Sequence, residues 1–278
     1  MRTAPETTGS KVAGALLGIQ IGDALAMPAH WYYDRTALQR DYGLITDFVV
    51  PKSPHPDSIL WRSKWHPPSP DLDILGDQRP FWGQRGVHYH QNLAAGESTL
   101  TGKLAAGLWH SINARGGFDV GDSLRFYIDL LTHPGRHRDT YLEECHRGFF
   151  TNLGLGTAPA KCAVEEKHIG GLTPMLAAAL YYPDQAELGR EMALEQLALT
   201  HAGQRMKIAA DAVLTLLYRV LDGESLEQAI LAECQLQHNP HFGFPYSKLL
   251  KKADRVVVGR HFSTACYVDG AVPAVIYL

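Results

Sequence analysis

Cysteine is scarce in this sequence, and neither sign of charge dominates. The four cysteines in 278 residues are scattered without a CxxC pair, which argues against a zinc ribbon or a disulfide framework and favours reduced thiols in the cytoplasm. The 26 Lys and Arg residues nearly balance the 29 Asp and Glu residues, so the net charge is −3 and no basic stripe is present. A nucleic-acid backbone is therefore not an expected partner, and a small-molecule or protein substrate is favoured.

The start of the chain lacks the long apolar core of a signal peptide. Its first residues, MRTAPETTGSK, are polar, and no stretch of about 20 uncharged apolar residues follows. We therefore expect neither export nor membrane insertion. We also expect residues 1–10 to form a disordered tail ahead of a single domain over residues 11–278.

Alternating strand patterns are rare as well, and helical periodicity dominates the chain. The sequence therefore predicts an all-α fold, a compact bundle of several helices joined mostly by short turns. The predicted helices are Val12–Ala26, Leu100–Ile112, Gly121–Leu131, Asp139–Asn152, Leu172–Leu180, Gln185–Leu199, Arg205–Leu221 and Ser225–Gln235.

Residues 43–96 lack helical periodicity and are rich in Pro, Trp, His and Gly. A structureless loop of this length is usually functional or disordered, and the tryptophans Trp61, Trp65 and Trp82 indicate a packed one. We interpret the region as an irregular cap over a site. A mobile surface excursion is the alternative.

The segment GALLGIQIGDALAMPAHW, residues 14–31, has glycines at four-residue spacing and one carboxylate in an apolar run. Each glycine in a helix interior costs about 1 kcal/mol against alanine, so Gly14, Gly18 and Gly22 predict a close approach to that face. Asp23 then either faces a polar cavity, as a catalytic group, or serves structurally by tying down a neighbouring loop.

Histidines and one glutamate provide candidates for acid–base chemistry. His30 follows Pro28 at the expected end of the first helix and could act as an acid or base near neutral pH. The motif HYHQ puts His88 and His90 on one side of an extended segment, and Glu97 follows shortly. We assign catalytic roles to Asp23, His30 and Glu97, and ligand-binding roles to Gly22, His88 and His90.

Other candidates lie at helix boundaries, where hydroxyls, glycines and free backbone N–H groups suit phosphate oxygens. Ordinary helix capping explains the hydroxyls equally well, and a favourable interaction with a helix dipole explains the histidine of the LTH junction. These ligand-binding candidates are Ser98, Thr99, Glu165, His168, Gly170, Gly171 and His201.

A zinc hydrolase is a further possibility, although no H-E-x-x-H spacing is present. Histidine and carboxylate side chains are the usual ligands of catalytic zinc. The potential ligands are Asp23, His30, His88, His90, Glu97 and His168.

In the order of these motifs, the chain resembles the ADP-ribosylglycohydrolase family, which includes the dinitrogenase-reductase-activating glycohydrolase and the J1-type crystallins. Family members open with GxxxGxxxGDALGxPxE, continue with TDDT at a helix start and a glycine-containing turn, and carry an LTH junction before a final GGDTDT-type motif. The corresponding stretches here are residues 14–30, 98–101, 170–171 and 199–201.

Departures from the family pattern concern the residues that hold two magnesium ions and assist the chemistry. Thr99 and Leu100 stand where the paired aspartates fall, and His30 stands where a glutamate falls. The chain ends in GAVPAVIYL, where the family continues into its last acidic motif. The sequence is thus similar to a divergent branch with HYHQ and GENTLN, and the usual dinuclear magnesium site is not expected.

The resemblance implies hydrolysis of a glycosidic bond in an ADP-ribosyl group or a related nucleotide sugar. The expected partner is an ADP-ribose-type small molecule or an ADP-ribosylated protein, with magnesium as the family's cofactor. A catalytically inactive binding or structural protein of the same fold, as the crystallins illustrate, is the alternative.

Overall fold

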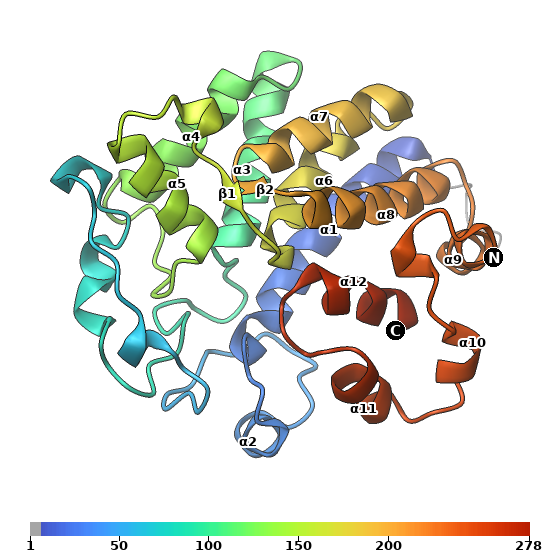
Figure 1. Ribbon diagram of the computed structural model, residues 1–278, viewed down its shortest axis with the longest axis horizontal. Helices are drawn as coiled ribbons and strands as arrows, with labels where there is room; N and C mark the ends of the chain where they lie inside the picture. The colour runs from blue at the N-terminus through green and yellow to red at the C-terminus, as the bar shows by residue number, and fades with distance from the viewer. Residues whose placement is uncertain (1–6) are drawn as a thin grey trace.

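The computed structural model describes residues 7–278 and confirms the all-α prediction, with 60% of these residues in helices and 3% in strands or isolated bridges (Figure 1). The α-helices are α1 Thr8–Ala26, α2 Arg35–Asp41, α3 Leu100–Arg115, α4 Val120–Thr132, α5 Glu144–Gly154, α6 Leu172–Leu180, α7 Ala186–Ala198, α8 Gln204–Leu221, α9 Leu226–Leu236, α10 Tyr246–Leu249, α11 Asp254–Val256 and α12 Val268–Tyr277. Two short parallel strands, β1 Val164–Glu165 and β2 His201–Ala202, pair with each other.

All eight predicted helices have counterparts, but one of them begins later than predicted. Residues 137–143 are irregular, with a bend at Thr140, and α5 begins only at Glu144 rather than at Asp139. The backbone N–H groups of Thr140 and Tyr141 both donate to the carbonyl of Tyr89, at 2.8 and 3.2 Å, so they do not start a helix. The predicted list also omits α2, α10, α11 and α12, which are short or interrupted by glycine and proline.

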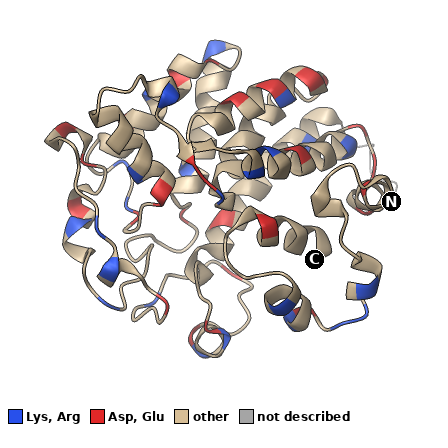
Figure 2. Ribbon diagram, viewed as in Figure 1, with Lys and Arg blue, Asp and Glu red and all other residues tan. Residues whose placement is uncertain are grey.

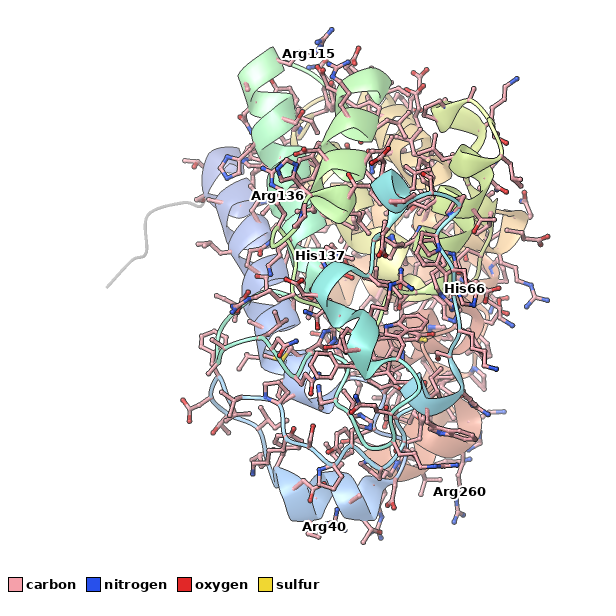
Figure 3. The ribbon with its side chains drawn as sticks, turned by 90° about the vertical axis from the view of Figure 1, so that its left-hand side faces the viewer. Arg40, His66, Arg115, Arg136, His137 and Arg260 are labelled. Atoms are coloured by element: carbon pink, nitrogen blue, oxygen red, sulfur yellow. The ribbon has the colours of Figure 1, made fainter. Side chains whose placement is uncertain are left out.

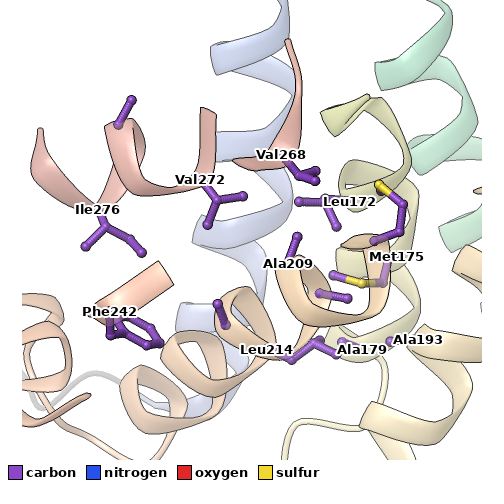
Figure 4. Close-up of a cluster of buried hydrophobic side chains, with 14 of the residues drawn as sticks. Leu172, Met175, Ala179, Ala193, Ala209, Leu214, Phe242, Val268, Val272 and Ile276 are labelled. Atoms are coloured by element: carbon purple, nitrogen blue, oxygen red, sulfur yellow. The ribbon is translucent and has the colours of Figure 1, made fainter. Parts of the chain in front are cut away.

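The largest core cluster lies where α6, α7, α8 and α12 meet (Figure 4). Small alanines, among them Ala179 and Ala209, let these helices approach closely, while Met175 and Phe242 fill the remaining space. Helix α6 also packs against α3, and a second cluster on the other side joins α3, α4 and α5. The molecule is therefore built around α3 and α6, with α1 laid across both.

Helix α1 is capped by the Thr7 side chain and begins at Thr8, so residues 8–10 belong to the helix rather than to the expected tail. Residues 1–6 of that tail lie outside the described residues. By length and composition, Thr8–Ala29 could cross a membrane, with 22% of its most apolar window buried. A mostly buried core helix of a soluble protein and a signal sequence near the N-terminus both pass the same test. Helix α1 packs against α3, α6 and α8.

The glycines of α1 do not mark a close contact with any other part of residues 7–278. A Cβ atom built on Gly14, Gly18 or Gly22 would meet nothing within 4 Å. The close approach comes from α3, because a Cβ on Gly102 would lie 2.7 Å from Asp23 Oδ2. Gly18 and Gly22 instead line a cavity, so the prediction of a close approach to this face stays open for a ligand.

The irregular segment 43–96 is packed, as its tryptophans predict, and it contains short 3₁₀ turns at Leu60–Arg62, Pro70–Leu72 and Gly76–Phe81. Leu60 and Tyr89 are buried within it, and Trp82 donates from Nε1 to the Thr140 carbonyl at 2.8 Å. Figure 3 views this side of the molecule and labels His66 in the segment and His137, whose Nε2 bonds to the Ile74 carbonyl of the segment at 3.1 Å. Charges of both signs are interspersed over the surface (Figure 2).

Candidate active site

A cavity of about 570 Å³ lies between α1, the start of α3, the 137–143 segment and the loop before α12. Its volume falls in the usual range for a small-molecule site. Its wall contains glycines from α1, aromatic rings from the turn after α1, and several titratable groups. The titratable or polar lining residues are Asp23, His30, Tyr32, His90, Thr99, Thr101, Asp139, Tyr141, Glu143, His146, Thr173, Thr264 and Cys266.

A relay of three side chains crosses this wall. Asp139 Oδ1 lies 2.7 Å from His90 Nδ1, and His90 Nε2 lies 2.7 Å from His30 Nδ1. Asp139 and His90 are buried, whereas His30 is half-buried and faces the cavity. The relay therefore runs from a buried carboxylate to an imidazole at the cavity surface.

The direction of the proton donors in the relay follows from its buried end. With His90 Nδ1–H donating to the Asp139 carboxylate, the other ring nitrogen, Nε2, accepts from His30 Nδ1–H. His30 Nε2 then carries a lone pair, and no group among residues 7–278 hydrogen-bonds to it. Burial and the neighbouring His90 and His88 rings lower the pKa of His30 well below its ordinary value, so the lone pair is available at neutral pH.

The Asp139 end of the relay carries the negative charge. Burial alone would raise the pKa of Asp139, but the hydrogen bond from His90 outweighs it and holds the pKa below its usual value. Its second oxygen, Oδ2, is buried without a hydrogen-bond partner in the described chain. The hydrogen bond from His90 therefore keeps Asp139 in its ionised form.

Two further histidines support the relay rather than face the cavity. His88 accepts at Nδ1 from the His90 backbone N–H at 3.0 Å and donates from Nε2 to the Pro28 carbonyl at 3.1 Å. His55 donates from Nε2 to the His30 carbonyl at 2.9 Å. Burial lowers the pKa of His88 to about 3, so it is a neutral structural group, and the predicted ligand-binding role is not supported by its position.

Asp23 performs the structural role that the sequence left open, and it also lines the cavity. Its Oδ2 accepts from the Thr99 backbone N–H at 2.6 Å, and its Oδ1 accepts from the Thr99 hydroxyl at 2.7 Å. These bonds attach the start of α3 to α1, because Thr99 is the residue before that helix. Burial raises the pKa of Asp23 despite both hydrogen bonds.

Glu143 lies where the large cavity meets two others, of about 20 and 400 Å³. A Cβ on Gly170 would lie 3.0 Å from Glu143 Oε2, so the glycine leaves room for this carboxyl group. Burial raises the pKa of Glu143 above its ordinary value. A carboxyl group in this state can hold a proton and donate it.

Several predicted site residues lie away from the large cavity. Glu97 pairs with Lys103 at 2.9 Å and with Arg138, so it does not join the other catalytic candidates. Ser98 donates to the Gln20 side chain at 2.7 Å and ties the loop to α1. The structure therefore brings together Asp23 and His30 of the three predicted catalytic residues.

The candidates from the middle of the chain divide between the cavities. Gly170 lines the large cavity, while His168 lines the neighbouring 400 Å³ cavity and Glu165 is exposed on β1. His201 packs on Gly171, where a Cβ would lie 2.6 Å from its ring, and it faces the 20 Å³ cavity. Burial lowers the pKa of His201 to about 4, so a charged histidine interacting with the helix dipole is not supported.

Side chains at the start of α3 do not fit the family's pair of magnesium ions. Thr99 donates its hydroxyl proton to Asp23, both oxygens of Asp23 are engaged by Thr99, and Leu100 is a buried apolar residue. Magnesium prefers several oxygen ligands, whereas the cavity also presents imidazole rings such as His30 and His90. Within residues 7–278, this donor set therefore does not match a dinuclear magnesium site.

The predicted zinc ligands are not gathered either, since His88 and Glu97 are bonded elsewhere. Among the described residues, one group of possible ligands has its atoms within 4.8 Å of one another, namely Glu143, Cys145 and His146. Burial raises the pKa of the Cys145 thiol well above its ordinary value. Cys145 is therefore a protonated core thiol and a poor zinc ligand.

Sequence reasoning missed Asp139, Tyr141 and Glu143 because it placed them partly on a helix. They alternate along the segment 137–143, and all three line the cavity, while Leu142 between them is fully buried. The letters DTYLE gave little signal, because Thr140 is polar and yet buried.

The fold and the site together define an all-α protein whose carboxylates and imidazoles converge on one cavity. The family model described as ADP-ribosylglycohydrolase matches residues 4–278, and the chain belongs to this family. A search of curated proteins finds no significant match. Membership supports a glycohydrolase-type function in general and ADP-ribosylated substrates as a kind of partner.

Proposed function

We propose that this chain hydrolyses the glycosidic bond of an ADP-ribosyl group, or of a related nucleotide sugar, in the 570 Å³ cavity. The observation that carries the proposal is the Asp139–His90–His30 relay, which ends on a free imidazole nitrogen at the cavity wall. Glu143 supplies a second titratable group in the same wall.

The proposed reaction uses these two groups on the two sides of the bond. Glu143 gives its proton to the departing nitrogen or oxygen as the anomeric carbon takes on oxocarbenium character. Water attacks that carbon, and His30 Nε2 accepts the water's proton. A weak base suffices, because water becomes acidic as it bonds to a cationic carbon. The ionised Asp139 stabilises the imidazolium chain that results.

The experiment is release of ADP-ribose from ADP-ribosylated arginine and serine substrates. We expect His30→Ala and Glu143→Gln to lower kcat by about 10²-fold or more, the usual contribution of a general acid or base. His66→Ala is the matched control, because His66 is exposed on the irregular segment (Figure 3). Full activity in His30→Ala would remove that residue from the mechanism.

A binding protein without catalytic activity is the second candidate. It is favoured by Asp23, whose two oxygens are engaged in attaching α3 to α1. Calorimetric binding of ADP-ribose without turnover of either substrate would support this candidate. Turnover that depends on His30 would exclude it.

A further inference from the structure

A further cavity, of about 430 Å³, lies between the irregular segment 43–96 and the turn that follows α4. Its lining shares no residue with that of the 570 Å³ cavity. One wall belongs to the irregular segment, and the other consists of residues 131–138. His137 Nε2 donates to the Ile74 carbonyl at 3.1 Å and ties the two walls together (Figure 3). The cavity is therefore a separate, preformed space of small-molecule size.

The Gln78 side chain leaves one amide donor unpartnered in the wall of this cavity. Gln78 is 7% exposed. Its Oε1 accepts from Asn92 Nδ2 at 2.6 Å and from the Thr140 hydroxyl at 3.0 Å, so the orientation of the amide group is fixed. Its Nε2 has no hydrogen-bond partner within residues 7–278, yet neighbouring atoms do not seal it off. Such a donor costs free energy unless a water or a ligand accepts from it.

Acceptors lie in the same wall as this donor. Asn92 uses Nδ2 to bond to Gln78, so its Oδ1 is left to accept from a ligand. The exposed Asp77 carboxylate also lines the cavity, and it forms no ion pair in the described chain. Asp73, by contrast, pairs with Arg79 at 2.5 Å. A hydroxyl group matches this mixed wall, because it both donates and accepts.

The charges around the cavity do not favour an ionic ligand. Arg138 in the wall is paired with Glu97, and His133 Nδ1 lies 3.3 Å from Asp129 Oδ1. Neither cation is therefore free to hold an anion. Asp77 is exposed to water, which weakens the pull of its charge on a cation. The buried polar groups of the wall are neutral amides, and they suit a neutral ligand.

We propose that the 430 Å³ cavity binds a neutral ring compound that carries several hydroxyl groups and has the size of a monosaccharide. Ring hydroxyls accept from Gln78 Nε2 and donate to Asn92 and Asp77. The C–H face of the ring lies against Phe81 and Leu131, which supply apolar lining. This binding is independent of the proposed hydrolysis and needs no ADP-ribosyl substrate.

The experiment records nitrogen–proton NMR spectra of the wild-type protein during titration with D-glucose, D-galactose, D-ribose and myo-inositol. We expect at least one of these compounds to shift the Gln78 side-chain amide and the backbone amides of Gly76 and Gly135, which belong to opposite walls. The Kd should be about 1–10 mM, a range that so small a ligand reaches. Cyclohexanol, with the same ring size as myo-inositol and a single hydroxyl, should not bind.

Gln78→Glu tests the unpartnered donor directly. It replaces Nε2 with an acceptor and keeps an oxygen for Asn92 and Thr140. We expect it to weaken binding of the sugar about tenfold or more, because a buried hydrogen bond to the ligand is lost. Gln84→Glu is the matched control and should leave the Kd unchanged, because Gln84 is exposed on the same segment and lies outside the cavity lining.

The proposal is overturned if none of the four compounds shifts these amides at concentrations about tenfold above that Kd range. Preferred binding of inorganic phosphate or of arginine would also overturn it, by showing an anion or a cation site. Shifts confined to Gly22 and Gly170 would place the sugar in the 570 Å³ cavity and refute the proposal. If Gln78→Glu fails to fold, the position of the shifts in the wild-type protein decides.

Discussion

Asp139→Asn is the sharpest perturbation of the proposed relay, because it keeps the shape of the side chain and removes its charge. Asp139 accepts from His90 Nδ1–H at 2.7 Å, and this bond sets the direction of every proton in the relay. An asparagine amide group turned toward His90 would donate to Nδ1 and move the His90 proton to Nε2. His30 would then accept at Nδ1 and carry its proton on Nε2, facing the cavity as a donor.

The magnitude follows from losing a general base. That loss costs about 10²- to 10⁴-fold in rate, or about 3 to 5 kcal/mol in the activation free energy. The effect on the free energy of unfolding is smaller. The variant loses a charge-assisted hydrogen bond, but it also avoids the cost of burying a charge. We expect the free energy of unfolding to fall by no more than about 2 kcal/mol.

Two measurements test the prediction together. ADP-ribose release from the arginine and serine substrates gives kcat, and nitrogen–proton correlation NMR of the imidazoles reports the tautomers of His30 and His90. Asp129→Asn is the matched control, because Asp129 is about half exposed and pairs with surface side chains. Wild-type kcat in folded Asp139→Asn, with the His30 tautomer unchanged, would refute the relay.

Three other predictions concern stability and cofactor dependence. Gly14→Ala should raise the free energy of unfolding by up to about 1 kcal/mol, because alanine favours a helix and its Cβ meets nothing within 4 Å. Gly107→Ala should lower the free energy of unfolding by about 1–3 kcal/mol or more, because its Cβ would lie 1.9 Å from the Phe126 ring. Denaturant unfolding measures both changes. The His168 pKa of about 10 lies above its unfolded value, so its stabilisation is complete below about pH 6.5 and lost as pH rises through about 10. The Glu166 pKa of about 2 lies below its unfolded value, so its stabilisation is present above about pH 4.5 and lost toward about pH 2. The measurement is the free energy of unfolding as a function of pH, and in His168→Gln its decline at alkaline pH should be absent. Chelation with EDTA should leave ADP-ribose release unchanged, and loss of activity that magnesium restores would contradict our interpretation of the donor set at α3.

Most helices were predictable from the sequence because their apolar faces repeat every three to four residues and bury against one another. The prediction failed at residues 139–143, where the backbone bonds to Tyr89 from a distant loop replace helical ones. Local pattern cannot reveal a hydrogen-bond acceptor some fifty positions earlier in the chain. Asp139 and Glu143 were missed for that reason.

The opening motif was predicted in part. Asp23 and His30 do line the cavity, and Asp23 also has the structural role given as its alternative. The glycines of α1 suggested a contact that the chain does not make there, since glycine spacing alone does not say which neighbour comes close. Glu97 looked catalytic because it follows HYHQ, but two cations lie within its reach.

The segment 137–143 makes the site depend on the number of residues in the chain and not only on their types. Asp139, Tyr141 and Glu143 face the cavity, whereas Thr140 bonds to Gln78 at 3.0 Å and Leu142 is in the core. Deleting one residue at the start of this stretch would turn both carboxyl groups inward and aim a leucine at the substrate. Asp139, Tyr141 and Glu143 would all still be present in the sequence, yet none of these three side chains would face the cavity.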